Sequence, residues 1–197
     1  MTFISEFLLA AMTALVVENA IFARSLGSSW MLYLIRHPRE LLDFTGIMTA
    51  VTVTASLIGY PLRSAIKLPG YEYITQPIIY IVCMLFVYCL AYLALRYLAP
   101  KLYDRIYRRL ADGAFNCAVL GALLIPATEN MDLARTLGYG IGVSLGFAGA
   151  VVLIGIGIGR LELCHVPKAF KGLPIVLIYI GLLSLALYGL IGHQLPT

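Results

Sequence analysis

Residues 113–127 read GAFNCAVLGALLIPA, an apolar segment of only 15 residues that is followed by the polar Thr128, Glu129 and Asn130. A helix needs about 20 apolar residues to cross the roughly 30 Å of hydrocarbon in a bilayer. This segment is too short for that, and a chain that stops being helical at membrane depth is tolerated where protein covers it. We therefore predict a half-helix packed within protein at 113–127.

Five longer apolar runs flank this segment, and each has about the length of a membrane span. They cover residues 3–23, 44–62, 74–95, 137–159 and 173–192. The chain of 197 residues is 61% hydrophobic and 12% charged, whereas soluble domains are about 45–50% apolar and about 25% charged. This composition predicts an all-α membrane protein, with one transmembrane domain over 1–197, about six transmembrane helices and no soluble domain.

The first run is interrupted as well. Glu18 and Asn19 fall inside it, and Arg24 with several small polar residues follows before the next apolar patch at 30–35. Residues 1–23 contain no Lys or Arg, so they lack the basic start of a signal peptide and are expected to remain as the first helix. Helices 1 and 4 of the six are thus predicted to be broken helices or half-helices.

The two interrupted segments share a short pattern, ENAI at 18–21 and FNCA at 115–118, and Asn19 and Asn116 are 97 positions apart, close to half the chain. We predict two three-helix repeats, about 1–98 and 99–197. Because three spans is an odd number, the second repeat enters the membrane from the opposite face, so the repeats are inverted. Matching interruptions in inverted halves indicate a site near the middle of the membrane.

Lysine and arginine are distributed unequally between the two sides of this arrangement. Basic residues in short loops stay cytoplasmic, so the richer side is predicted to be the cytoplasmic one and both termini to lie outside. These basic residues are explained as topology signals, and nucleic acid is not expected as a partner. The richer side holds Arg24, Arg36, Arg39, Arg96, Lys101, Arg105, Arg108, Arg109, Arg160, Lys168 and Lys171, and the other side holds Arg63, Lys67 and Arg135.

The fifth run contains Gly138, Gly142 and Gly146 at four-residue spacing, followed by Gly155 and Gly159. This spacing leaves one helix face nearly bare of side chains, which is typical of close helix packing in membranes. The sequence leaves open whether that face packs within this chain or against a partner subunit.

Glu18 is the candidate residue for an ion pathway. A carboxylate at the bilayer centre costs about 2.5–3.5 kcal/mol on insertion scales, so it needs a partner, a proton or a watery cavity. A helix break near Asn19 could bring Arg24 to it; the alternative is that Glu18 lies near the interface and is simply solvated. Asn19 and Asn116 are candidates for bonding the backbone groups freed where the half-helices end, which is a structural role.

Four cysteines, Cys83, Cys89, Cys117 and Cys164, form no CxxC pair, so the pattern indicates neither a zinc site nor a disulfide framework. Cys83 and Cys89 are expected to be small buried residues. No glycine fingerprint for a dinucleotide follows a predicted strand. The chain is therefore not expected to be catalytic by itself, and we assign no catalytic residue.

Three stretches resemble the Rnf/Nqr family of membrane subunits, and together the resemblance covers essentially the whole chain. They are ENAIFARSLG at 18–27, APKLYDRIYRRLADGAFNCAVLGALL at 99–124 and VPKAFKGLPIVLIYIGLLSLALYGLIG at 166–192. The ENxxxxxxLG element is most similar to the RnfA and NqrE branch. The most specific parts are NCAxxG (Asn116, Cys117, Ala118, Gly121) and VPxxFxG (Val166, Pro167, Phe170, Gly172).

The resemblance implies a six-helix inverted-repeat subunit of the bacterial cytoplasmic (inner) membrane, paired with a homologous subunit of opposite topology and with further Rnf/Nqr-like subunits. Such a complex passes electrons and moves Na⁺ or H⁺. The resemblance also implies a 2Fe-2S cluster near the midplane, held by one Cys from each half-helix of each subunit. Cys117 matches the second-repeat ligand, but Ser29 stands where the family has the first-repeat Cys.

That difference leaves alternatives open, because iron in such clusters is held by thiolates and serine oxygen is a poor substitute. Either the cluster is ligated differently, with the Ser29 oxygen or a partner's thiol, or this subunit has lost it. The leading functional hypothesis is a membrane subunit of an ion-translocating electron-transport complex, which the NCAxxG element favours. A small non-redox inverted-repeat transporter or channel is the alternative, which Ser29 favours, and a scaffold subunit is the weakest.

Overall fold

The computed structural model describes residues 3–65, 72–161, 167 and 170–191, so Lys67, Cys164, Val166 and Lys168 lie outside the described residues. Every regular element of the described part is helical. The elements are α1 (Phe3–Met12), a π-helical turn η1 (Thr13–Val17), α2 (Ser28–Arg36), a short 3₁₀ turn η2 (Pro38–Glu40), α3 (Leu41–Ala65), α4 (Glu72–Leu98), α5 (Pro100–Ala114), α6 (Cys117–Thr128), α7 (Leu133–Leu161) and α8 (Leu173–Ile191).

Four segments of the described chain are long and apolar enough to cross a membrane, namely Pro38–Arg63, Ile74–Tyr97, Ile106–Thr128 and Leu133–Leu161. Two apolar helices, Phe3–Val17 and Leu173–Gly189, are shorter. The prediction of an all-helical fold is therefore confirmed for the described residues, and four helical segments have the length and composition of membrane spans. The first apolar run differs from the expectation in its length, because the helix ends at Val17 rather than at residue 23.

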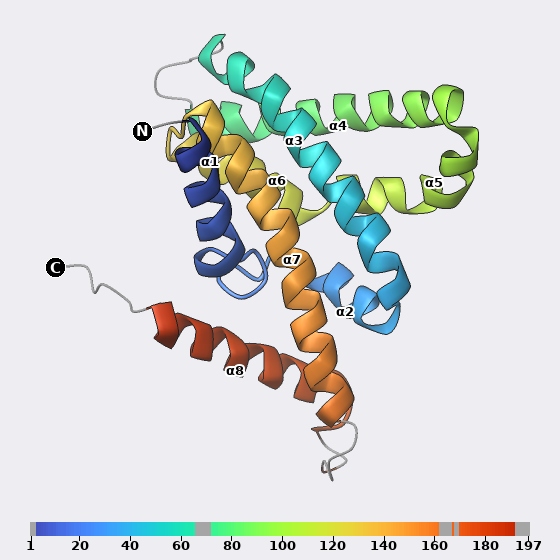
Figure 1. Ribbon diagram of the computed structural model, residues 1–197, viewed down its shortest axis with the longest axis vertical. Coiled ribbons are helices and arrows are strands. Elements are labelled where there is room, and N and C mark those ends of the chain that lie inside the picture. The colour runs from blue at the N-terminus through green and yellow to red at the C-terminus, as the bar shows by residue number, and fades with distance from the viewer. Residues whose placement is uncertain (1–2, 66–71, 162–166, 168–169, 192–197) are drawn as a thin grey trace, which may run out of the picture.

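Helix α7 is the centre of the fold, and it contacts α1, α2, α3 and α6. In Figure 1 it crosses the molecule next to α3, with α1 against its upper part. A Cβ atom on Gly138 would overlap the carbonyl group of Phe7, and one on Gly142 would overlap that of Ala11. The first part of the glycine stripe therefore packs against α1 of this same chain, where only glycine lets the two backbones approach so closely.

The second part of the stripe is left largely open by the residues that the structure describes. A Cβ atom on Gly155 would have one neighbour within 4 Å, Cγ2 of Ile35 at 3.9 Å, and one on Gly159 would have none. Helix α8 follows this end of α7 but leaves it at an angle and makes few contacts with the rest of the chain (Figure 1).

Helix α5 corrects one expectation, since the segment around Arg105 was expected to be a loop and is helical. The segment is rich in charge, but Ile106 and Leu110 are four residues apart, so both lie on the same side of a helix. Leu110 is 3% exposed, and Arg109 binds Glu40 and Asp43 near the start of α3. α5 is therefore amphipathic, with one buried face and one charged face.

The expectation for the cysteines of α4 is half right. Cys83 is buried, whereas Cys89 is exposed. The apolar residues of α4 are distributed around the whole helix, so the sequence does not indicate which of its faces packs against the rest of the chain. An exposed apolar face is normal where lipid or a partner subunit covers it.

Candidate functional site at the two helix breaks

The first break follows η1, which ends at Val17 and is capped by Glu18. Asn19 is 5% exposed, and its side chain bonds the backbone that the helix end leaves free. Its Nδ2 donates to the carbonyl of Leu15 (3.0 Å) and to that of Gly146 in α7 (2.9 Å), and its Oδ1 accepts from the N–H of Ile21 (3.0 Å). Asn19 thus closes the end of the helix and ties the break to α7.

Glu18 lies next to Asn19 and has two partners. Its Oε2 accepts a hydrogen bond from the Tyr139 hydroxyl (2.9 Å) and lies 3.3 Å from Nη2 of Arg24. The side chain of Glu18 is 29% exposed, whereas Tyr139 is 1% exposed. The break does bring Arg24 to Glu18, so the carboxylate is paired with a cation and a phenol rather than simply solvated.

A narrow cleft lies between this group and α6. Its walls include Glu18, Arg24, Leu26, Gly121 and Tyr139, and it has no room for a water molecule. Glu18 therefore lies at the wall of a protein-lined cleft that is closed.

The second break separates α5 from α6 at Phe115 and Asn116. Asn116 is the N-cap of α6, and its Oδ1 accepts from the N–H of Ala118 (3.2 Å). It is 3% exposed, and its Nδ2 has no hydrogen-bond partner among the described residues. Both asparagines thus bond backbone groups near a helix end, Asn19 after the end of η1 and Asn116 at the start of α6.

The two breaks meet. Gly27 has a φ of 76° and is the N-cap of α2, and a Cβ atom there would lie 2.8 Å from Cε2 of Phe147 and 3.0 Å from Oδ1 of Asn116. Leu26 fills the space that a Cβ atom on Gly121 would need. The Leu-Gly pair of the first break thus packs on the Asn and Gly of NCAxxG, so the starts of α2 and α6 are adjacent.

Ser29 and Cys117 lie at these helix starts. Ser29 is the second residue of α2 and Cys117 the first of α6, and both are exposed on the surface of this chain. Iron–sulfur clusters are held by cysteine sulfur, so Cys117 has the donor type for such a ligand, whereas the hydroxyl of Ser29 does not fit a four-thiolate set.

Within the described part of the chain, no three His, Cys, Asp or Glu side chains come together in a way that could hold a metal ion. Sequence reasoning missed Tyr139, which is the buried partner of Glu18. Its signal was available, because a tyrosine inside an apolar span needs a hydrogen-bond partner when it is buried. What the sequence lacks is the register that places it opposite Glu18, 121 residues away.

Comparison with known proteins identifies the family to which the chain belongs. Residues 7–193 match the family described as Rnf-Nqr subunit, membrane protein. One subunit of the Na⁺-translocating ferredoxin:NAD⁺ oxidoreductase complex of Acetobacterium woodii is 32% identical over 93% of this chain and 95% of its own length. One subunit of the ion-translocating oxidoreductase complex of Syntrophotalea carbinolica is also 32% identical, over 94% of this chain and 96% of its own. The corresponding subunit of the ion-translocating oxidoreductase complex of Aliivibrio salmonicida is 29% identical, over 95% of this chain and 97% of its own length. The chain belongs to the Rnf-Nqr family of membrane subunits.

Proposed function

We propose that this chain is a membrane subunit of an ion-translocating oxidoreductase complex. In this role it carries electrons across the membrane together with a homologous partner subunit, and the transfer is coupled to movement of Na⁺ or H⁺. The observation that supports it best is the contact of the two helix breaks at Gly27 and Asn116. That contact joins two of the sequence elements that resemble the family, ENxxxxxxLG and NCAxxG, and relatives named as subunits of such complexes match along nearly their whole length.

The order of elements supports a repeat. A helix, a break, a short helix and two further helices occur as α1 to α4 and again as α5 to α8. We propose that these halves are the inverted three-helix repeats, with both termini outside and with helices 1 and 4 broken. The chain then lies in the bacterial cytoplasmic membrane, and its partner has the opposite topology.

We propose further that Cys117 offers one thiolate to a 2Fe-2S cluster shared with that partner. Its exposure at the surface of this chain leaves it accessible to a neighbouring subunit. Ser29 occupies the position of a second ligand with a hydroxyl, so this chain brings one thiolate where the family pattern has two. By the same pattern the partner supplies two thiolates, which leaves one position for the Ser29 oxygen or for a further thiol of the partner.

Glu18 is the proposed ion-pathway residue. Its carboxylate lies at the break and is held by Tyr139 and Arg24 at the wall of a closed cleft. An ion or a proton that approached Glu18 would compete with Arg24 for the same oxygen. The cleft must widen for this exchange, and the break is the place where the chain can move without breaking helical hydrogen bonds.

The test uses membrane vesicles from cells of the source organism in which the gene for this chain has been deleted. Variants of the chain are then expressed in these cells. Ferredoxin-dependent reduction of NAD⁺ and ion uptake are measured separately. Glu18→Gln keeps the size of the side chain but removes its charge, so we expect uptake per electron to fall about tenfold while the complex still assembles. Tyr139→Phe, which leaves the charge of Glu18 in place, should cost less. Unchanged uptake in Glu18→Gln would make Glu18 a structural residue.

One observation favours a second function, a non-redox transporter or channel. Ser29 stands where the family pattern has a thiol, which weakens any cluster at this site. Proteoliposomes that contain this chain and its membrane partners, without an electron donor, distinguish the two functions. Steady ion flux under those conditions supports the transporter, whereas flux that requires ferredoxin supports the electron-transport role.

A further inference from the structure

A second hollow of about 830 Å³ lies between the end of α2, the end of α7 and the start of α8. It shares no lining residue with the cleft at Glu18. Its size is within the range of about 300–1,000 Å³ that is typical of ligand-binding clefts. Nothing in the proposed electron or ion pathway uses it.

One wall of this cavity is apolar and smooth. Gly155 and Gly159 of α7 present bare backbone there, and no atom lies within 4 Å of a Cβ atom built on Gly159. Ile175 and Val176 of α8 face the same space. A slot of this kind, between two membrane helices that diverge, suits an alkyl chain, because it offers close contact without a polar group to desolvate.

The lining of the cavity also carries positive charge. Arg36 and Lys171 are part of it, and no Asp or Glu is among the described residues of the lining. Neither Arg36 nor Lys171 makes an ion pair with any other residue that the structure describes. Within the part of the chain that the structure describes, these two cations therefore have no counter-charge in the cavity.

Helix dipoles account for the position of Arg36 but not for that of Lys171. Arg36 is the last residue of α2, where a cation is favourable. Lys171, in contrast, lies two residues before α8 begins at Leu173. The start of a helix is itself positive, so a cation there is unfavourable unless an anion lies between them.

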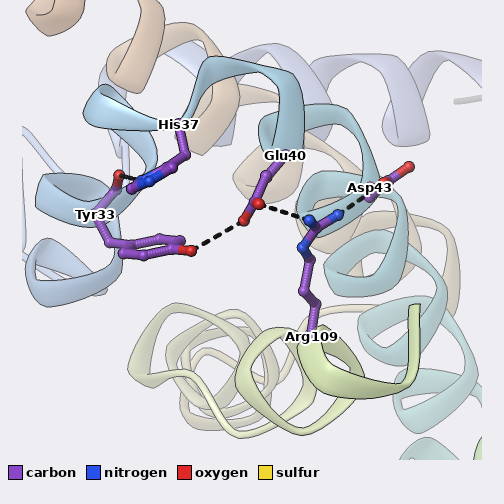
Figure 2. Close-up of polar contacts among 5 residues, drawn as sticks. All are labelled: Tyr33, His37, Glu40, Asp43 and Arg109. Atoms are coloured by element: carbon purple, nitrogen blue, oxygen red, sulfur yellow. Dashed lines mark hydrogen bonds and ion pairs between the residues drawn. The ribbon is translucent and has the colours of Figure 1, made fainter. Parts of the chain in front are cut away.

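The two acidic residues that follow the end of α2, Glu40 and Asp43, are already occupied, as Figure 2 shows. Glu40 accepts a hydrogen bond from the Tyr33 hydroxyl (3.2 Å) and lies 2.6 Å from Nη2 of Arg109, and Nη1 of Arg109 is 3.0 Å from Asp43. The ring of Tyr33 stacks on His37 at 4.4 Å between centroids. These contacts hold Tyr33 and His37, which line the cavity, in place. They also leave no described carboxylate for Arg36.

We propose that this cavity binds an anionic phospholipid, with its phosphate between Arg36, Lys171 and the start of α8 and an acyl chain along Gly155 and Gly159. Charge favours an anion, and the apolar wall favours a lipid over free phosphate. Arg36, Lys171 and the neighbouring Arg160 all lie at helix ends on the side predicted to be cytoplasmic. Anionic lipids are abundant in the cytoplasmic leaflet, and basic pockets between membrane helices bind their headgroups.

The test uses the purified, delipidated complex and measures its thermal stabilisation by added lipid. Phosphatidylglycerol is compared with phosphatidylcholine of the same chains and with inorganic phosphate. We expect stabilisation by phosphatidylglycerol alone. Arg36→Gln and Lys171→Gln should each weaken its binding about fivefold, because a basic residue near an anionic lipid contributes ~1 kcal/mol. Arg39→Gln, an exposed arginine outside the cavity, is the matched control and should bind as wild type.

A second variant tests the apolar wall. Gly159→Leu has free space around it and improves helix propensity, so the complex should fold, yet its side chain would fill the slot and reduce phosphatidylglycerol binding at least tenfold. Equal binding of the two lipids, equal stabilisation by inorganic phosphate, or unchanged binding in Gly159→Leu would overturn the proposal. Cross-linking of Gly159→Cys to another subunit would also overturn it, by showing that protein fills the cavity.

Discussion

A Cβ atom on Gly27 would lie 3.0 Å from the amide oxygen of Asn116, so the start of α2 rests directly on the start of α6. The two residues come from different halves of the chain. Their contact means that each short helix positions the other, and that a change at one break is transmitted to the second.

Gly27→Ala should destabilise the protein. The left-handed backbone at this position costs a residue with a side chain about 1–2 kcal/mol, and the added methyl group would press on Phe147. We expect a lower Tm in thermal unfolding of the purified complex. Gly149→Ala is the control, because no atom lies within 4 Å of a Cβ atom there. Equal Tm values for the two variants would show that the breaks are loosely packed.

Asn116→Ala should weaken the start of α6. It removes the side-chain oxygen that accepts from the N–H of Ala118, and loss of such a cap costs about 0.5–2 kcal/mol. Asn116→Ser keeps a capping oxygen and should retain most of the stability. Hydrogen exchange at the first turn of α6 is the measurement, and similar exchange in both variants would argue against the cap.

Cys117→Ala should remove the iron signal from the purified complex, if Cys117 is the thiolate that this chain contributes. Ser29→Cys should increase iron retention, because sulfur is a better iron ligand than a hydroxyl. Iron content and the electron paramagnetic resonance spectrum report both effects without an activity assay. Cys89→Ala, an exposed cysteine on α4, is the control. If Cys117→Ala holds as much iron as wild type and transfers electrons at the same rate, the redox role of this site is wrong.

The orientation can be tested by thiol labelling in intact cells. Asp104→Cys, beside Arg105 on α5, should react only after the cells are opened, since its side is predicted to be cytoplasmic. Glu129→Cys, in the turn between α6 and α7, should react with an impermeant reagent added outside. Both are compared with the parent protein, which has exposed thiols of its own. The reverse pattern would invert the topology.

The sequence predicted the two breaks because each is marked by polar residues within an apolar segment, Glu18-Asn19 and Asn116. It did not predict α5, because its many charges hide the spacing of the apolar residues that face the core. The sequence also did not predict which face of α4 is buried, since the apolar residues of that helix lie on all of its faces.

Contacts between distant segments could not be predicted from the sequence for a different reason. The hydroxyl of Tyr139 reaches Glu18 only because α7 lies against α1 in one particular register. Glycine spacing in α7 indicates close packing, but it does not name the partner helix or the residues that come opposite. The cleft and the Glu18 cluster therefore required the structure.

The contact of α1 with α7 also bears on how the protein is made. Helix α1 leaves the ribosome first, but the residues that satisfy its end come much later, since Asn19 bonds to Gly146 across 127 residues and Glu18 to Tyr139 across 121. Until α7 has been inserted, α1 remains in the membrane with a carboxylate and an amide that lack these partners, which is costly in hydrocarbon. Nascent chains that end before α7 are thus expected to be natural targets for membrane quality control, and the insertion of α7 to be the step that releases the subunit for assembly.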